Sequence, residues 1–189
     1  SAELSADPDV EITIVESKDV PTIGVGEGTV PYIMKALKRF GISEVELLSS
    51  CDATFKQGIK FVNWLDATKH GENHYYHSFD DPYPNGFNVT PYWNSHEEDR
   101  PFDDIGLQAR ISERGLSPKM KSSAEYEGEL AYAYHFNAGK FANLLANNAK
   151  KRFNIKHQYA TVEGIKKCAQ GNISHLITTD GDELAFDFY

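Results

Sequence analysis

Residues 51–64 read CDATFKQGIKFVNW and have the alternating pattern of a β-strand. Successive side chains of a strand point to opposite faces, so Lys56 and Lys60 share one face. The other face is apolar and carries Phe55, Ile59 and Phe61. A lysine on the inner face of a sheet must find an anion, lose its proton or take part in chemistry, because burying an unpaired ammonium is costly. Lys56 is therefore the first candidate for a catalytic residue; the alternative is a solvated face that balances an acidic chain.

The composition indicates a folded domain, or part of a larger one, because 40% of the 189 residues are hydrophobic and 12% are aromatic. A net charge of -9, without a cluster of lysines and arginines, argues against nucleic acid as a partner. No apolar run approaches the ~18 residues of a membrane span, so we expect no membrane association. Cys51 and Cys168 lie far apart and favour the reducing cytoplasm. Both ends of the chain lie close to or inside expected strands, which predicts a fragment of a longer protein.

The region before residue 51 carries two candidate cofactor contacts. Residues 11–16 form an expected strand that ends on Glu16, and an acid at such a position binds ribose hydroxyls in dinucleotide folds. The alternative is a solvated strand end. In VPTIGVGEGTVP, residues 20–31, Gly24, Gly26 and Gly28 alternate with larger residues and allow a flat ligand or another backbone to come close. The spacing is a weak match to a phosphate-binding glycine loop.

The rest of the chain predicts an α/β fold with an appended β-meander. We expect one helix between Pro31 and Gly41, and a second helix that starts with the capping pair Ser43 and Glu46. Residues 70–104 form a long excursion, within which residues 96–99 are interpreted as a solvated acidic loop. The remaining expected elements are a strand at 131–136, a helix over 141–149, and strands at 159–167, 173–178 and 183–188.

The segment HYYHSF, residues 74–79, places His77 and Phe79 on one side of an extended chain. Two aromatic rings at this spacing can stack on a flat aromatic ligand, and packing in a core is the alternative. His74 and His77 could also bind a metal, but further ligands have no obvious source, so we expect no metal.

Four blocks together carry a resemblance to a known family: VESKDVPTIGVGEGTVP, CDATFKQGIKFVNW, HYYHSF and YAYHFNAGKFANLL. Their order and spacing resemble the flavin-dependent tryptophan halogenases over nearly the whole chain. The resemblance implies that Lys56 is the catalytic lysine and that His77 and Phe79 stack on the substrate indole. It implies that Gly28 replaces the usual alanine of a GVGEAT-like loop. The implied FAD contacts are Glu16, Gly26, Glu27, Gly28, Thr29 and, by its backbone, Val162.

By this resemblance, residues 1–189 are a partial FAD-binding domain of the Rossmann-like, flavin monooxygenase type. The GxGxxG unit is expected upstream, and the C-terminal substrate part with its WxWxIP block and the acidic partner of the lysine is expected downstream. The implied reaction uses oxygen, chloride or bromide, and FAD that a separate flavin reductase supplies in reduced form. Hypohalous acid then reaches the lysine, which hydrogen-bonds it or becomes a haloamine, and a small electron-rich aromatic substrate takes the halogen. A homodimer is one option for the assembly.

Two other functions remain open on the residues alone. An FAD-dependent aromatic monooxygenase shares the fold but does not need Lys56. A non-catalytic protein that binds flavin or an aromatic ligand would keep HYYHSF without the chemistry.

Overall fold

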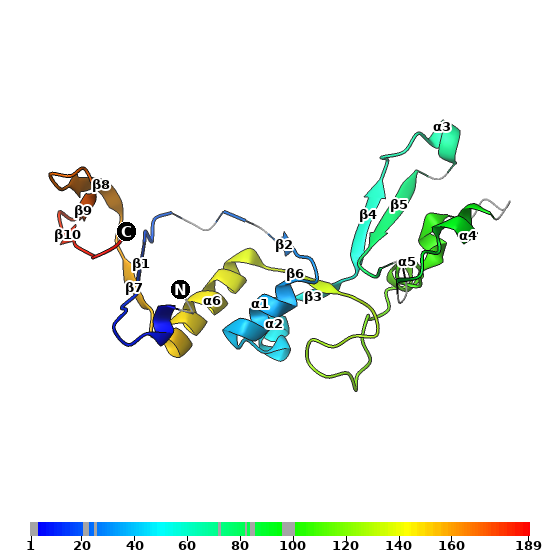
Figure 1. Ribbon diagram of the computed structural model, residues 1–189, viewed down its shortest axis with the longest axis horizontal. Helices are drawn as coiled ribbons and strands as arrows, with labels where there is room; N and C mark the ends of the chain where they lie inside the picture. Colours follow the sequence, from blue (N-terminus) through cyan, green and yellow to red (C-terminus); the bar gives the residue numbers. More distant parts are fainter. Residues whose placement is uncertain are drawn as a thin grey trace. The chain divides into compact units, whose positions relative to one another are not determined.

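The computed structural model describes residues 4–20, 23–24, 26–71, 73–81, 83, 86–95 and 101–189. It has the expected α/β fold and consists of two compact units, shown in Figure 1. Unit 1 contains Ser1–Val25 and Gly139–Tyr189, and unit 2 contains Gly26–Ala138. The acidic loop that the sequence places at residues 96–99 lies outside the described residues.

Unit 1 combines a parallel strand pair with an antiparallel meander. Strand β1 (Thr13–Glu16) pairs in parallel with β7 (Lys156–Tyr159), and α6 (Ala138–Phe153) precedes β7 in the chain. The meander consists of β8 (Val162–Lys167), β9 (Ile173–Thr178) and β10 (Glu183–Leu184), and its turns contain Gly171 and Gly181 at positive φ. The meander confirms the sequence prediction, except that its first strand begins at Val162 and its last ends at Leu184 instead of residue 188. Strand β7 was not expected, because its sequence KHQY is polar. A short 3-10 helix, η1 (Leu4–Ala6), lies near the start.

Unit 2 contains two sheets and most of the helices. Its first sheet has the strand order β2-β6-β3, formed by β2 (Glu27–Gly28), β6 (Ala133–Phe136) and β3 (Thr54–Lys56). Its second sheet pairs β4 (Gly58–Val62) with β5 (His74–Ser78) in antiparallel fashion. The helices are α1 (Ile33–Phe40), α2 (Glu44–Ser50), α3 (Ala67–His70), α4 (Thr90–Asn94), η3 (Phe102–Ile105) and α5 (Gln108–Glu113).

The ends of α1 and α2 follow from the local sequence. Gly41 ends α1 in the left-handed conformation, with φ at 66°, which a residue without Cβ adopts at little cost. Ser43 caps α2, since its hydroxyl accepts a hydrogen bond of 3.0 Å from the backbone N–H of Glu46. Both ends confirm the sequence prediction, although α1 begins at Ile33 rather than at Pro31.

Residues 51–64 do not form one strand, and this part of the prediction is wrong. The chain leaves the first sheet after Lys56 and enters the second sheet at Gly58, so the two lysines belong to different sheets. The backbone at this change of sheet needs a glycine at position 58. Any other residue would place its Cβ 2.6 Å from the carbonyl oxygen of His77, which is too close. The two strands pair with different partners, and only these long-range pairings reveal the break.

The core of unit 2 lies between the first sheet and the helices α1 and α2 (Figure 1). Tyr132 and Tyr134 are fully buried, and Phe55 of the neighbouring strand packs on both, with ring centroids 5.2 and 6.1 Å apart. The helical side of this core consists of Leu37, Ile42, Leu47 and Cys51, all buried. Tyr134 of β6 and Tyr132 just before it therefore point into the core, and His135 lies exposed on the other face of the sheet.

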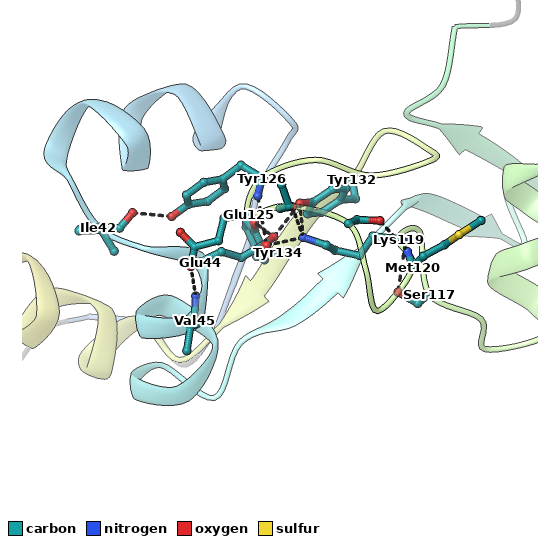
Figure 2. A network of polar contacts seen from close by, with 12 residues as sticks. Ile42, Glu44, Val45, Ser117, Lys119, Met120, Glu125, Tyr126, Tyr132 and Tyr134 are labelled. Carbon is teal, nitrogen blue, oxygen red and sulfur yellow. Dashed lines mark hydrogen bonds and ion pairs between the residues drawn. The ribbon is translucent and has the colours of Figure 1, made fainter.

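A buried carboxylate, Glu44, lies at the centre of this core (Figure 2). Its Oε1 accepts hydrogen bonds from the hydroxyls of Tyr132 (2.6 Å) and Tyr134 (2.7 Å). Its Oε2 accepts a hydrogen bond from the backbone N–H of Tyr126 (3.1 Å) and forms an ion pair with Lys119. Burial alone raises the pKa of Glu44, but these donors outweigh it and hold the pKa below its usual 4.5. Burial raises the pKa of both tyrosines, which remain hydrogen-bond donors.

We expect Glu44→Gln to lower the free energy of unfolding by about 3–5 kcal/mol, because Lys119 would keep a buried charge without its partner. The lowered pKa means that Glu44 stabilises the fold above pH ~4.5 and that this contribution is lost as the pH falls through the folded-state pKa. Urea denaturation between pH 3 and 7 measures both effects. The exposed Glu46→Gln on the same helix is the control; equal losses in the two variants contradict the prediction.

Candidate functional site

Lys56 lies at the end of β3, on the open face of the first sheet. Its Nζ donates a 3.0 Å hydrogen bond to the backbone oxygen of Thr29, and its side chain is half-buried. Thr29 is fixed in turn by Tyr134, whose carbonyl oxygen accepts from the N–H and the hydroxyl of Thr29. Among the described residues, Lys56 has no carboxylate partner. The ammonium is therefore held by one neutral acceptor and keeps further donor capacity.

Phe79 is the aromatic residue beside this ammonium. The Nζ of Lys56 lies 5.4 Å from the centre of the Phe79 ring, within the range of a cation–π contact. Phe79 follows β5 directly, and its backbone N–H donates to the carbonyl oxygen of Gln57 over 3.3 Å. His77 is exposed on β5 and lines a cavity of about 130 Å³ together with Asp80 and Gln108. The structure thus brings Phe79 to Lys56, whereas His77 borders a different hollow.

A cavity of about 500 Å³ borders Lys56 on the open face. Gln57, Tyr76 and His135 also line it, and the segment 115–118 forms its opposite wall. The buried Oε1 of Gln57 has no hydrogen-bond partner among the described residues. The volume suits a small organic molecule, and the lining includes the ammonium of Lys56 as a hydrogen-bond donor.

His135 is a neighbour of Lys56 that the sequence did not single out. It lies opposite Gly28 in the β2–β6 pair, and a Cβ built on Gly28 would lie 3.2 Å from the imidazole and 3.3 Å from the Nζ of Lys56. Glycine therefore leaves the space in which these two side chains meet. The ring is partly exposed, but burial of its inner side and the charge of Lys56 together lower the pKa of His135 from its usual 6.5.

In unit 1, Glu16 and Val162 lie near one end of the parallel pair. Glu16 is the exposed last residue of β1, and its carbonyl oxygen accepts from the N–H of Ala160 over 2.9 Å. The hydroxyls of Ser17 and Thr161 lie 2.6 Å apart, and Val162 follows. His157 Nε2 lies 2.9 Å from a carboxylate oxygen of Glu16, but at angles that do not form a hydrogen bond. Carboxyl ends of parallel strands are the usual places for ligands in open α/β sheets.

Comparison with known proteins connects this geometry to one family. Residues 2–189 match the family model described as tryptophan halogenase. The chain belongs to the tryptophan halogenase family. It is 31% identical to tryptophan 7-halogenase RebH of Lentzea aerocolonigenes, over 95% of this chain and 36% of that protein.

Solved structures give the same family assignment. A tryptophan halogenase from Shewanella frigidimarina is similar with a TM-score of 0.85 and 34% identity, over 97% of this chain and 38% of that one. A flavin-dependent halogenase from Xanthomonas campestris gives 0.74 and 26%, over 98% and 36%. The chain thus spans little more than a third of the length of the halogenases that it matches.

The residues of each unit fit the flavin cofactor that this family implies. Gly26 and Gly28 are exposed and carry no side chain, and a Cβ on Gly26 would meet only the carbonyl oxygen of Phe136, at 3.7 Å. Glu27 and Gly28 are paired to β6, so the edge that they form is held in a fixed, extended shape. In unit 1, the carboxylate of Glu16 is exposed and can accept hydroxyl donors beside its contact with His157. The glycine edge therefore suits a flat ring system, and the carboxylate of Glu16 suits the hydroxyls of a ribose.

Lys60, the other lysine of the opening stretch, lines the same cavity, but its ammonium has a different partner. It forms an ion pair with Glu113, and the side chains are 37% and 50% exposed. Among the residues that the structure describes, the two lysines therefore differ, because the ammonium of Lys60 is paired with a carboxylate and that of Lys56 is not. Within the described residues, no group of three or more histidines, cysteines and acids is arranged to hold a metal ion. None of the described helices has the length and apolarity needed to cross a bilayer.

We expect Lys56→Met to raise the pKa of His135 towards 6.5, because the substitution removes a positive charge that disfavours the imidazolium. Burial remains, so the shift back is partial. Lys60→Met is the matched control, since Lys60 is paired with Glu113 and does not act on His135. An NMR titration of the imidazole measures both variants, and an unchanged pKa in Lys56→Met contradicts the described contact.

Proposed function

We propose that residues 1–189 form the part of a flavin-dependent halogenase that binds FAD and presents the catalytic lysine, Lys56. The rest of that halogenase, with the GxGxxG unit and the C-terminal substrate part, completes the site. The observation that carries the proposal is the half-buried ammonium of Lys56, bound to one carbonyl oxygen and adjacent to the ring of Phe79. Membership of the tryptophan halogenase family supports it.

FAD is the proposed cofactor, and a separate flavin reductase supplies it in reduced form. When bound, it provides the chemistry that converts oxygen and chloride or bromide into hypohalous acid. In this proposal Glu16 and the backbone of Val162 bind the adenosine end. The edge formed by Gly26, Glu27, Gly28 and Thr29 lies along the flavin, and its glycines allow a close approach of the ring system.

Lys56 activates the hypohalous acid by proton donation. Its ammonium donates to the oxygen of the acid while the halogen is attacked by a carbon atom of the arene. The carbon–halogen bond forms, the oxygen–halogen bond breaks, and water leaves with the proton of the ammonium. The ring then releases its own proton, which restores aromaticity and returns the amine to its ammonium form. The carbonyl oxygen of Thr29 accepts one hydrogen bond of the ammonium, which leaves its other donors for the hypohalous acid and for the acidic partner expected in the C-terminal part.

The proposed substrate is a small electron-rich aromatic compound, tryptophan or another indole. Phe79 provides an apolar face within 5.4 Å of the ammonium, and His77 provides the second stacking ring once the complete site has formed. RebH and the Shewanella frigidimarina protein are both named tryptophan halogenases, which supports an indole.

We expect Lys56→Met in the full-length halogenase to reduce halogenation to below the limit of detection while FAD binding is unchanged, because only the proton donor is lost. The assay contains reduced FAD, oxygen, bromide and a panel of indoles that includes L-tryptophan, with mass spectrometry of the products. Flavin binding is measured by fluorescence.

Lys60→Met is the matched control and should retain activity, since its ammonium is bound to Glu113. Halogenation by the Lys56→Met enzyme would contradict the role of Lys56. Incorporation of oxygen without bromide would contradict halogenation itself and would indicate a monooxygenase.

A further inference from the structure

Lys56 and Phe79 belong to different sheets, although their side chains meet. Lys56 ends β3 in the first sheet, and Phe79 follows β5 in the second. Along the chain the two sheets are joined by Gln57 alone, because β3 ends at Lys56 and β4 begins at Gly58. A single residue is a poor constraint on the angle between two sheets. One further link is the 3.3 Å hydrogen bond from the N–H of Phe79 to the carbonyl oxygen of Gln57, and the 5.4 Å separation of the ammonium and the ring depends on what else holds Phe79 in place.

Gln108, the first residue of α5, supplies a connection between the sheets. Its side chain is 1% exposed, and its Oε1 accepts the backbone N–H groups of Phe79 (2.6 Å) and Asp80 (2.7 Å). Its Nε2 donates to the carbonyl oxygen of Ala131, two residues before β6. Asp80 closes the ring of contacts, since its Oδ1 accepts the N–H of Ala131 over 2.6 Å. We name these four hydrogen bonds the Gln108 clasp.

The clasp needs an amide and not merely a polar side chain. The amide oxygen accepts two N–H donors while the amide nitrogen donates to a carbonyl oxygen, a combination that glutamine and asparagine offer without a charge and without binding a proton. A carboxylate in its place would face both the Ala131 carbonyl and Asp80 with the wrong charge. The oxygen and the nitrogen of this buried amide both form hydrogen bonds. The side chain is therefore rigid, because breaking any of these bonds leaves a buried polar group unsatisfied.

We propose that Gln108 is a positioning residue that sets the distance between the Lys56 ammonium and the Phe79 ring, and with it the place at which the arene is halogenated. This inference rests on the proposed function. Gln108 touches neither Lys56 nor a reacting atom: it holds the backbone of Phe79 on one side and the entry to β6 on the other. Ala131 lies two residues before β6, and Ala133 of β6 is the pairing partner of Lys56 in β3. A shift of Ala131 therefore also shifts Lys56. Displacements of about 1 Å at such a site cost on the order of 100-fold in rate.

The test compares Gln108→Leu, which removes three of the four hydrogen bonds at similar volume, with Gln170→Leu, an exposed control in unit 1. Asp80→Ala, which removes only the fourth hydrogen bond, is the milder second variant in case Gln108→Leu does not fold. The full-length halogenase is assayed with reduced FAD, oxygen, bromide, indole and L-tryptophan. The measured quantities are kcat, KM and the ratio of regioisomers.

For Gln108→Leu we expect kcat to fall by about 10- to 100-fold and the regioisomer ratio to change, with FAD binding intact. For Asp80→Ala we expect a smaller change in the same direction, and none for Gln170→Leu. Partial unfolding lowers the amount of active enzyme but leaves the ratio of regioisomers unchanged. An unchanged ratio in both clasp variants therefore overturns the proposal.

A second measurement is independent of catalysis. With 4-fluorophenylalanine at position 79, the change of the ¹⁹F shift caused by Lys56→Met reports how close the charge lies to the ring. We expect this change to shrink in the Gln108→Leu or Asp80→Ala background, and equal changes overturn the proposal. If the wild-type enzyme halogenates no indole, the proposed function fails, and this cycle alone decides the role of Gln108.

Discussion

The carboxylate of Glu44 is the constraint on which unit 2 depends. A carboxylate that is 3% exposed must be surrounded by donors, because its desolvation is otherwise too costly. Three of its donors come from residues 126–134 and one from Lys119 (Figure 2). One buried charge therefore holds the segment from Lys119 to Tyr134, which leads into β6, in place. Replacing the group by apolar residues would not reproduce this, since hydrogen bonds to a charge specify positions that apolar contacts leave free.

The candidate site lies on the other face of β6, away from Glu44. Tyr132 and Tyr134 point to Glu44, whereas the buried Ala133 and the exposed His135 lie on the face of the sheet that carries Lys56. β6 pairs with β2 on one edge and with β3 on the other, which brings the glycine edge and Lys56 to a common strand. The Glu44 network and the Gln108 clasp thus act on two ends of one segment: the first fixes β6 against the helices, and the second fixes its entry against Phe79.

The sequence predicted what depends on near neighbours. The glycine that ends α1, the serine that caps α2 and the turns of the meander are set by one or two residues each, and the structure confirms them. The break at Gln57 was missed because both halves of 51–64 have strand patterns, and only the choice of partner strand separates them. Glu44 and Gln108 were missed for a related reason. An acid or an amide at a helix start is ordinary at the surface, and its burial depends on residues 23 to 90 positions away.

The difference between Lys56 and Lys60 shows how the fold assigns chemistry to residues that the sequence presents as equivalent. Four positions apart, they share residue type and expected face, yet Lys60 meets Glu113 while Lys56 meets a carbonyl oxygen and an aromatic ring. A carboxylate compensates the charge of Lys60 and occupies its donors, whereas the acceptors of Lys56 are neutral and only partly satisfy it. At Gln57 the chain passes from the first sheet to the second, which places the two lysines in separate sheets and produces this difference. The roles proposed for Glu16, Val162, His77 and the glycine edge remain predictions, but the asymmetry between the lysines follows from the fold itself.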